Sequence, residues 1–238
     1  MRGNGSGVLM WALVLFDIDG TLMDAAGAGR SALQRTAEGL FGGELDFRGV
    51  ATAGRLDRAI FAEAAANAGW DECDAAYGRL CGRYPEELAA ELVRLGSAVR
   101  VLPGAMVLLN ELRARDGVVL GCVTGNQRAA AAVKLRAVGI DPGWFGVGGY
   151  GDEAATRPEL VAMAMRRHAE VAGEPVASER VVVVGDTPHD IDAANRHGCV
   201  SVAVATGRYG EAELAAAGAD VVMEGLRDPG PVLDLVKR

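Results

Sequence analysis

The chain contains only four cysteines, and none of them is clustered with another. Cys73, Cys81, Cys122 and Cys199 show neither Cys-x-x-Cys spacing nor a neighbouring histidine pattern. This distribution argues against a zinc-binding motif and against a disulfide framework. Cys122 and Cys199 lie in apolar, strand-like segments. We therefore expect four reduced thiols, most of which have a structural role.

Long hydrophobic runs and an excess of basic residues are also missing. The longest apolar runs fall well short of the roughly 20 residues that a membrane helix needs, and the glycine-rich residues 1–7 contain no signal-peptide core. The 24 basic and 32 acidic residues give a net charge of −8, without a basic cluster long enough to follow a phosphate backbone. We expect a soluble, cytoplasmic protein, monomeric or homodimeric, that binds neither nucleic acid nor membranes.

What the sequence does contain is a regular alternation of strand-like and helix-like segments. Half of the 238 residues are hydrophobic, so the chain can bury a sizeable core. Besides an apolar strand at 12–16, we expect strands at 118–123, 146–149, 181–184, 200–204 and 220–223. Helices are expected after Pro103-Gly104, around 130–137 with an apolar stripe of Ala130, Val133 and Ala137, at 157–169, at 211–216 and at the C-terminus. Such alternation predicts an α/β fold with a doubly wound parallel sheet.

Residues 25–98 interrupt this alternation, because they contain no convincing strand. They carry three apolar stripes at helical spacing, namely Leu33, Ala37 and Leu40, then Leu56, Ile60 and Ala64, then Leu88, Leu92 and Leu95. We expect a small α-helical domain at 25–98, inserted into a core domain that consists of 1–24 and 99–238. Its hinges are predicted after Asp24 and before Pro103.

The glycine-rich run at 146–151 satisfies the pattern G-x-G-x-x-G. A dinucleotide-binding turn also needs a preceding strand and a helix that begins within the glycines, and neither is predicted here. We expect these glycines to allow close backbone approach around a short strand instead.

The most informative segment is LFDIDGTL, residues 15–22, in which an apolar strand ends in two carboxylates. Side chains two residues apart share one face of a strand, so Asp17 and Asp19 can point into one site. Gly20 breaks the strand. In open α/β sheets, ligands bind at the carboxyl ends of the strands. Taken alone, the two carboxylates favour a turn in which they accept hydrogen bonds from loop amides.

Two further buried strands end in polar turns. Thr124-Gly125-Asn126 follows 118–123 directly before a helix, where it suits either an anion site or a helix N-cap. Residues 185–190, GDTPHD, follow 181–184 and place Asp186 and Asp190 four residues apart. These two carboxylates suit either a functional site or the stabilisation of a helix N-terminus.

Together these turns resemble, in order, the motifs of the haloacid dehalogenase (HAD) superfamily of phosphohydrolases. That order is Asp-x-Asp-Gly-Thr, then Thr or Ser, then a basic residue, then Gly-Asp-x-x-x-Asp. The resemblance extends over nearly the whole chain, because the helical insertion matches the cap of one large branch, which includes phosphoglycolate phosphatases and β-phosphoglucomutases.

The third motif departs from the usual family pattern. The family generally has a lysine there, often followed by proline, whereas this chain has Arg157-Pro158. Arginine keeps the positive charge and offers a planar fork to phosphate oxygens. It also opens a predicted helix, where a cation is unfavourable with the helix dipole, so we favour a functional role for Arg157. Lys134 is a rival for that role, although a solvated position at a helix edge is our preferred interpretation of it.

The resemblance implies a role for each motif residue. Asp17 is then the nucleophile that forms an aspartyl-phosphate, and Asp19 the general acid and base. Mg²⁺ is implied as cofactor, held by Asp17, Asp186 and the main-chain carbonyl of Asp19, with Asp190 acting mainly through hydrogen bonds or water. The residues expected to hold the phosphoryl group or substrate are Thr124 and Arg157, together with Gly20, Thr21, Gly125, Asn126 and Lys134.

The predicted cap contains one further candidate. Its segment TAGRLD, residues 52–57, resembles a loop that contacts substrate in related phosphatases and mutases. Arg55 is a candidate for binding an anionic substrate group, with a surface ion pair to an acidic neighbour as the alternative.

These residues predict a magnesium-dependent phosphatase that acts on a small phosphorylated metabolite. A phosphomutase of the β-phosphoglucomutase type is the alternative, and a non-catalytic HAD-like binding module is a third hypothesis. Dehalogenation is disfavoured, because haloacid dehalogenases lack the second carboxylate that Asp19 provides.

Overall fold

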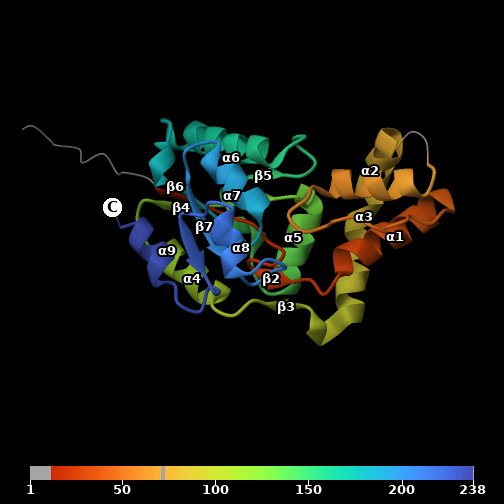
Figure 1. The fold of residues 1–238 in the computed structure, drawn as a ribbon, viewed down its shortest axis with the longest axis horizontal. Coiled ribbons are helices and arrows are strands. Elements are labelled where there is room, and N and C mark those ends of the chain that lie inside the picture. The colour runs from red at the N-terminus through yellow and green to blue at the C-terminus, as the bar shows by residue number, and fades with distance from the viewer. Residues whose placement is uncertain (1–11, 71–72, 238) are drawn as a thin grey trace, which may run out of the picture.

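A parallel sheet forms the centre of the molecule in the computed structural model, which describes residues 12–70 and 73–237, with only the backbone described at Cys73. Its six strands lie in the order β5-β4-β1-β6-β7-β8 (Figure 1). Their bounds are β1 Ala12–Phe16, β4 Val118–Thr124, β5 Val147–Tyr150, β6 Val181–Gly185, β7 Val200–Val204 and β8 Val221–Met223. These strands confirm the predicted α/β fold.

Helices cover both faces of this sheet. They are α4 Ala105–Arg113, α5 Arg128–Ala137, α6 Arg157–Ala172, α7 Pro188–Asn195, α8 Glu211–Ala216 and α9 Gly230–Leu235, with short 3₁₀ turns at Gly96–Ala98, Pro142–Trp144 and Ser178–Arg180. Alternate residues of β1 face opposite sides, so Val14 and Phe16 pack with α4, α5 and α9, whereas Leu13 and Leu15 pack with α6 and α7. Figure 1 shows α6 and α7 on one side of the sheet and α4 and α9 on the other.

The segment 25–98 is helical, as predicted. It contains α1 Ala28–Phe41, α2 Asp57–Asn67 and α3 Cys73–Leu95, which lie to the right of the sheet in Figure 1. A short antiparallel ladder joins its two ends, formed by β2 Met23–Asp24 and β3 Arg100–Val101. The division into a cap at 25–98 and a core of 1–24 and 99–238 stays a prediction.

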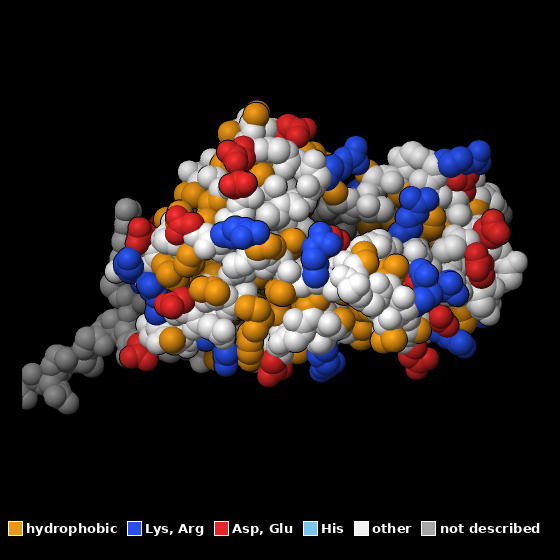
Figure 2. Space-filling model, turned by 90° about the horizontal axis from the view of Figure 1, so that it is seen from below, with side chains coloured by type: hydrophobic (Ala, Val, Ile, Leu, Met, Phe, Trp, Pro, Cys, Tyr) orange, Lys and Arg blue, Asp and Glu red, His pale blue; other side chains and the backbone are white. Residues whose placement is uncertain are grey.

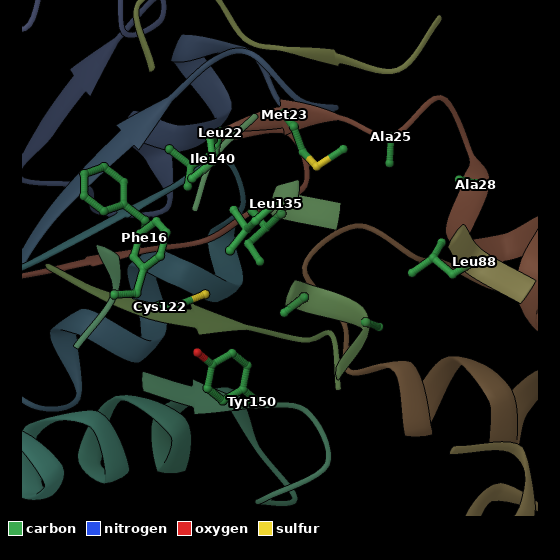
Figure 3. Close-up of a cluster of buried hydrophobic side chains, with 14 of the residues drawn as sticks. Phe16, Leu22, Met23, Ala25, Ala28, Leu88, Cys122, Leu135, Ile140 and Tyr150 are labelled. Carbon is green, nitrogen blue, oxygen red and sulfur yellow. The ribbon is translucent and has the colours of Figure 1, made fainter. Parts of the chain in front are cut away.

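One apolar cluster runs from the sheet into these helices. Figure 3 shows part of it, in which Phe16, Cys122 and Tyr150 come from neighbouring strands and Met23, Ala28 and Leu88 continue toward α1 and α3. Burial of apolar surface therefore holds the helical segment against the sheet in the arrangement seen here.

The predicted apolar stripe of α5 is wrong in part. The buried side chains of α5 are Ala130, Ala131, Lys134 and Leu135, and Ala137 is exposed. The inner face of this helix includes a lysine that reaches a polar cleft, so the spacing of apolar residues alone placed the buried face incorrectly.

The glycine run at 146–151 forms β5 and its flanking turns, and no helix begins within it. A Cβ atom at Gly149 would lie 2.3 Å from the carbonyl oxygen of Leu160, which is closer than carbon and oxygen atoms pack. The close backbone approach predicted for this run is thus confirmed.

The surface carries charges of both signs. On the face in Figure 2, Lys and Arg side chains alternate with acidic and neutral ones. None of the helices in the described part of the chain is long and apolar enough to cross a membrane. Cys81, Cys122 and Cys199 are free thiols, and the prediction for the Cys73 side chain lies outside the described residues.

Candidate active site

Three neighbouring strands bring the predicted motif residues together. Strand β1 pairs with β4 on one side and β6 on the other, so their parallel carboxyl ends meet at one edge. Ten of the predicted residues line one cleft of about 410 Å³, namely Asp17, Asp19, Gly20, Arg55, Thr124, Gly125, Asn126, Lys134, Arg157 and Asp186. Thr21 and Asp190 are buried behind this lining.

Three buried carboxylates form the acidic part of the cleft. Oxygen atoms of Asp17, Asp186 and Asp190 all lie within 4.8 Å of one another. Burial, together with repulsion from neighbouring carboxylates, raises the pKa of both Asp17 and Asp186. All ligands in this group are oxygen atoms, and the negative charge on each buried carboxylate is unfavourable without a nearby cation. The group could therefore hold a hard cation such as Mg²⁺.

Neighbouring side chains hold this acidic group in place. The Thr21 hydroxyl donates to Asp186 Oδ1 at 3.1 Å. The Thr187 amide and hydroxyl both donate to Asp190 Oδ2, at 3.1 and 2.7 Å, which also completes a capping box at the start of α7. Asp190 therefore stabilises the N-terminus of α7, which was one of the alternatives considered for it, and it also belongs to the buried acidic group. Its part in a functional site stays a prediction.

Arg157 lies among these carboxylates. One of its terminal nitrogens is 2.8 Å from Asp17 Oδ2 and 2.7 Å from Asp190 Oδ1, and the other donates to the Gly54 carbonyl oxygen at 2.9 Å. Burial opposes its charge, but the carboxylates of Asp17 and Asp190 outweigh burial and hold the pKa of Arg157 above its usual value. Arg157 is the first residue of α6, as expected, and it contacts the candidate nucleophile directly.

Lys134 is part of the cleft, so the preferred prediction of a solvated lysine at a helix edge is wrong. Its side chain is 5% exposed, and its Nζ lies 2.6 Å from both Asp19 Oδ2 and Asn126 Oδ1. The acidic partner lies 115 positions away in the sequence, so local spacing could not reveal the pair. The two cations serve different carboxylates, because Arg157 pairs with Asp17 and Asp190 whereas Lys134 pairs with Asp19.

Asn126 connects the second motif to this network. Its amide nitrogen donates to Asp19 Oδ2 and to Thr124 Oγ1, both at 2.8 Å. The N-cap of α5 is Gln127, so neither Thr124 nor Asn126 caps that helix. The alternative of a plain helix cap is therefore wrong for both residues.

Arg55 forms the ion pair that was the alternative considered for it, and its binding of an anionic substrate group stays a prediction. Its guanidinium pairs with Glu63 and also donates to the Ala51 carbonyl oxygen at 3.3 Å. It nevertheless lines the cleft from the side of the predicted cap.

Several further residues line or support the cleft without having been predicted from the sequence. The loop after β7 contributes Thr206, whose hydroxyl donates to the Gly20 carbonyl oxygen at 2.5 Å, and Gly207, where a Cβ atom would lie 1.7 Å from Asp186 Oδ2. A polar turn at the end of the predicted strand 200–204 was the available signal for both. Asp57, which ends the predicted substrate loop 52–57, and Arg30 also line the cleft, and for Arg30 only the tertiary position reveals this.

Comparisons with known proteins agree with this geometry. The chain matches the haloacid dehalogenase-like hydrolase family over residues 14–195. A phosphoglycolate phosphatase from Rhodospirillum rubrum is 30% identical over 217 residues, which cover 89% of this chain and 86% of that protein. A phosphoglycolate phosphatase from Synechococcus elongatus is 26% identical over 211 residues, covering 89% and 92%.

Solved structures share the fold. CbbY from Rhodobacter sphaeroides in complex with phosphate has a TM-score of 0.72 at 24% identity and covers 93% of this chain and 97% of its own. A hydrolase from Pseudomonas syringae has a TM-score of 0.66 at 24% identity, covering 94% and 98%. At such identities the likeness establishes the fold alone. The family match and the relative at 30% identity establish more: the chain belongs to the haloacid dehalogenase-like hydrolase family and is an enzyme.

Proposed function

We propose that this enzyme is a magnesium-dependent phosphatase that hydrolyses a small phosphate monoester through an aspartyl-phosphate intermediate. The observation that carries the proposal is that the carboxylates of Asp17 and Asp19 have different surroundings in the same cleft. Asp17 belongs to a buried acidic group, whereas Asp19, two residues further on, faces the same cleft and is held by Lys134. This difference supports a mechanism in which Asp17 attacks phosphorus and Asp19 transfers protons. The two curated relatives named phosphoglycolate phosphatase support this class of substrate.

The two carboxylates differ in their access to the cleft. The Asp17 side chain is 5% exposed and is fixed by Arg157, as suits a nucleophile that must approach phosphorus in line. The Asp19 side chain is 41% exposed, so it can reach the leaving oxygen and then the attacking water. Asp19 donates a proton to the leaving oxygen and later takes one from the water that hydrolyses the intermediate.

Mg²⁺ fits the acidic group. Asp17, Asp186 and the main-chain carbonyl of Asp19 would hold the ion, with Asp190 behind them, and the ion would neutralise their charge and that of a phosphate oxygen. Arg157 and Thr124, which both line the cleft, would hold the remaining phosphoryl oxygens. Catalysis then consists mainly of positioning and of charge stabilisation in the transition state. A cleft of about 410 Å³ suits a small metabolite.

The first prediction tests the nucleophile. Asp17→Asn keeps the size of the side chain but removes the attacking carboxylate, so release of inorganic phosphate from p-nitrophenyl phosphate with Mg²⁺ should fall to background. The matched control is Asp192→Asn, because Asp192 is exposed on α7 and pairs with the exposed Arg196. Circular dichroism should show the same fold for both variants. Undiminished turnover by Asp17→Asn contradicts the proposal.

A phosphomutase is distinguished in the same assay. Activity that depends on a bisphosphorylated sugar and releases no inorganic phosphate would replace the proposed phosphatase by the alternative, a mutase of the β-phosphoglucomutase type.

A further inference from the structure

Asp57 is a buried carboxylate that the proposed reaction does not use. It is the first residue of α2, in the predicted cap, and it is 7% exposed. Its amide donates to the Gly125 carbonyl oxygen at 2.8 Å, and its Oδ2 accepts from the Gln127 amide at 3.2 Å. A single residue of the cap thus makes two hydrogen bonds to the loop between β4 and α5.

These two hydrogen bonds lie on either side of Asn126. The Asn126 carbonyl oxygen itself accepts from the Gly151 amide at 2.8 Å. The backbone that carries Asn126 is therefore held at three successive residues, two of them by Asp57. Its side chain contacts Asp19, Thr124 and Lys134, so the Asn126 side-chain amide and Lys134 together hold the candidate general acid.

The Asp57 carboxylate lies at the N-terminus of α5, where backbone amides lack partners within the helix. Gln127, the N-cap residue of α5, makes no side-chain capping bond of its own. Asp57 supplies one carboxylate to this helix start from the predicted cap, and Asp152 supplies another, whose Oδ1 accepts from the Arg128 amide at 2.9 Å. Both negative charges are favourable with the dipole of α5.

The hydrogen bonds of Asp57 require the cap loop to lie directly on the core. A Cβ atom at Gly125 would be 2.1 Å from the Arg55 carbonyl oxygen, and one at Gly54 would be 2.4 Å from Thr187 Oγ1. Gly125 packs against the backbone of Arg55 and Gly54 against the Thr187 side chain, with no room for a methyl group at either position. A small displacement of loop 52–57 would therefore break both hydrogen bonds of Asp57.

We propose that Asp57 is a positioning residue, which couples the seating of loop 52–57 to the orientation of Asn126 and thereby to Asp19. The inference rests on the proposed function, because it assigns Asp19 the proton transfer. When loop 52–57 packs against the core, Asn126 and Asp19 are held in the orientation seen here while substrate is bound. When the loop moves away, the hydrogen bonds of Asp57 are lost and Asn126 and Asp19 are less firmly oriented.

Amide hydrogen exchange tests, without any substrate, whether Asp57 holds the loop between β4 and α5. In Asp57→Ala, the Gln127 amide should exchange at least tenfold faster than in the wild type. Asp57→Asn retains an oxygen acceptor and should restore protection. Asp74→Ala is the matched control, because Asp74 is an exposed carboxylate of α3 that pairs with Arg58. Unchanged exchange at Gln127 in Asp57→Ala overturns the inference.

The effect of Asp57 on proton transfer by Asp19 is tested by comparing substrates with different leaving groups. Alkoxide departure needs a proton from Asp19, whereas p-nitrophenolate leaves with little help. Asp57→Ala should therefore lower kcat for glycerol phosphate by about 10-fold to 100-fold, toward the lower end of general acid–base effects, and lower kcat for p-nitrophenyl phosphate much less. KM should change little for either substrate, and Asp57→Asn should recover most of the loss.

The outcomes separate the two proposals. An equal loss of kcat for both phosphates, with faster exchange at Gln127, means that Asp57 is only structural and overturns the coupling. A wild-type enzyme that hydrolyses neither phosphate overturns the proposed function and the coupling with it. Active wild type with unchanged exchange in Asp57→Ala overturns the inference alone.

Discussion

Two buried cations in the cleft hold different carboxylates. Arg157 contacts Asp17 and Asp190, where a phosphoryl group would be transferred, and Lys134 contacts Asp19, where a proton would be transferred. A planar guanidinium can bridge two carboxylates, whereas a compact ammonium suits a single one. The difference between the two residue types thus matches a difference in role.

Replacing each cation by alanine should separate these roles. Arg157→Ala should lower kcat for p-nitrophenyl phosphate by about 10²-fold to 10³-fold, the usual effect of losing one donor to a transition-state charge. Lys134→Ala should damage that reaction far less but should slow an alkyl phosphate more than an aryl one. Both rates are measured as release of inorganic phosphate. A larger loss for Lys134→Ala than for Arg157→Ala on the aryl phosphate would transfer the third-motif role to Lys134.

Asp57 also affects stability in a pH-dependent way. Burial, reinforced by Asp19 and Asp152 and opposed by Lys134, raises the pKa of Asp57 from 3.8 to about 6. The folded state therefore binds this proton more tightly than the unfolded state, and the stabilisation is lost as pH rises from about 4 through about 6.

We expect Asp57→Asn to raise the free energy of unfolding at pH 8 by up to about 3 kcal/mol, which corresponds to a shift of roughly two pH units. The gain should shrink as the pH is lowered to 5, and urea unfolding at both pH values measures it. A variant less stable than wild type at pH 8, or a gain that grows in acid, would contradict this assignment.

At the scale of elements, the candidate site is formed by loops that lie close together. The loops after β1, β4, β6 and β7 converge at one edge of the sheet, and loop 52–57 covers them from the helical side. Rigid strands position the first four loops, whereas the covering loop depends on close contact with Gly125. That contact makes Gly125 sensitive to any side chain.

Gly125→Ala should therefore displace loop 52–57. Displacements of about 1 Å in a reacting geometry can cost about 10²-fold in rate, and we expect a loss of kcat/KM approaching this size. Gly78→Ala in α3 is the control, because its Cβ atom would meet nothing within 4 Å. In this helix the control should be neutral or stabilising by about 0.5–1 kcal/mol. Wild-type activity in Gly125→Ala would show that the loop accommodates the methyl group.

At the scale of the whole molecule, the proposed Mg²⁺ site in the acidic group would couple metal binding to stability. A ligand that binds only the folded state stabilises it by about 2.7 kcal/mol at a concentration of 100 times its Kd. Mg²⁺ should thus raise Tm, and a chelator should reverse the effect. Because burial raises the pKa of Asp186, neutralising that carboxylate in Asp186→Asn should raise the Tm of the metal-free protein and abolish the response to Mg²⁺.

Asp192→Asn should respond to Mg²⁺ as the wild type does, because Asp192 lies outside the acidic group. Thermal unfolding at constant ionic strength gives the measurement. An equal Mg²⁺ shift in Asp186→Asn would place the ion elsewhere.

Much of the fold and part of the site could be predicted from the sequence. Apolar runs locate strands because both faces of a parallel sheet are buried, and the polar turns that follow them locate the site because parallel strands end at one edge. The convergence of Asp17, Thr124 and Asp186 follows from this regularity. The position of Lys134 does not, since its neighbours on α5 are apolar and its acidic partner lies on another element.

The sequence by itself determined which strands carry carboxylates at their ends and which segment interrupts the alternation, because hydrophobic periodicity and turn residues act over a few neighbouring positions. Only the tertiary structure decided that Arg157 pairs with Asp17 and Asp190 while Lys134 pairs with Asp19. It also decided that Asp57 contacts the N-terminus of α5 from the helical segment. Those contacts join residues 70 to 115 positions apart in the two pairs Asp57–Gln127 and Asp19–Lys134. They depend on the distance between packed elements, which no local pattern specifies.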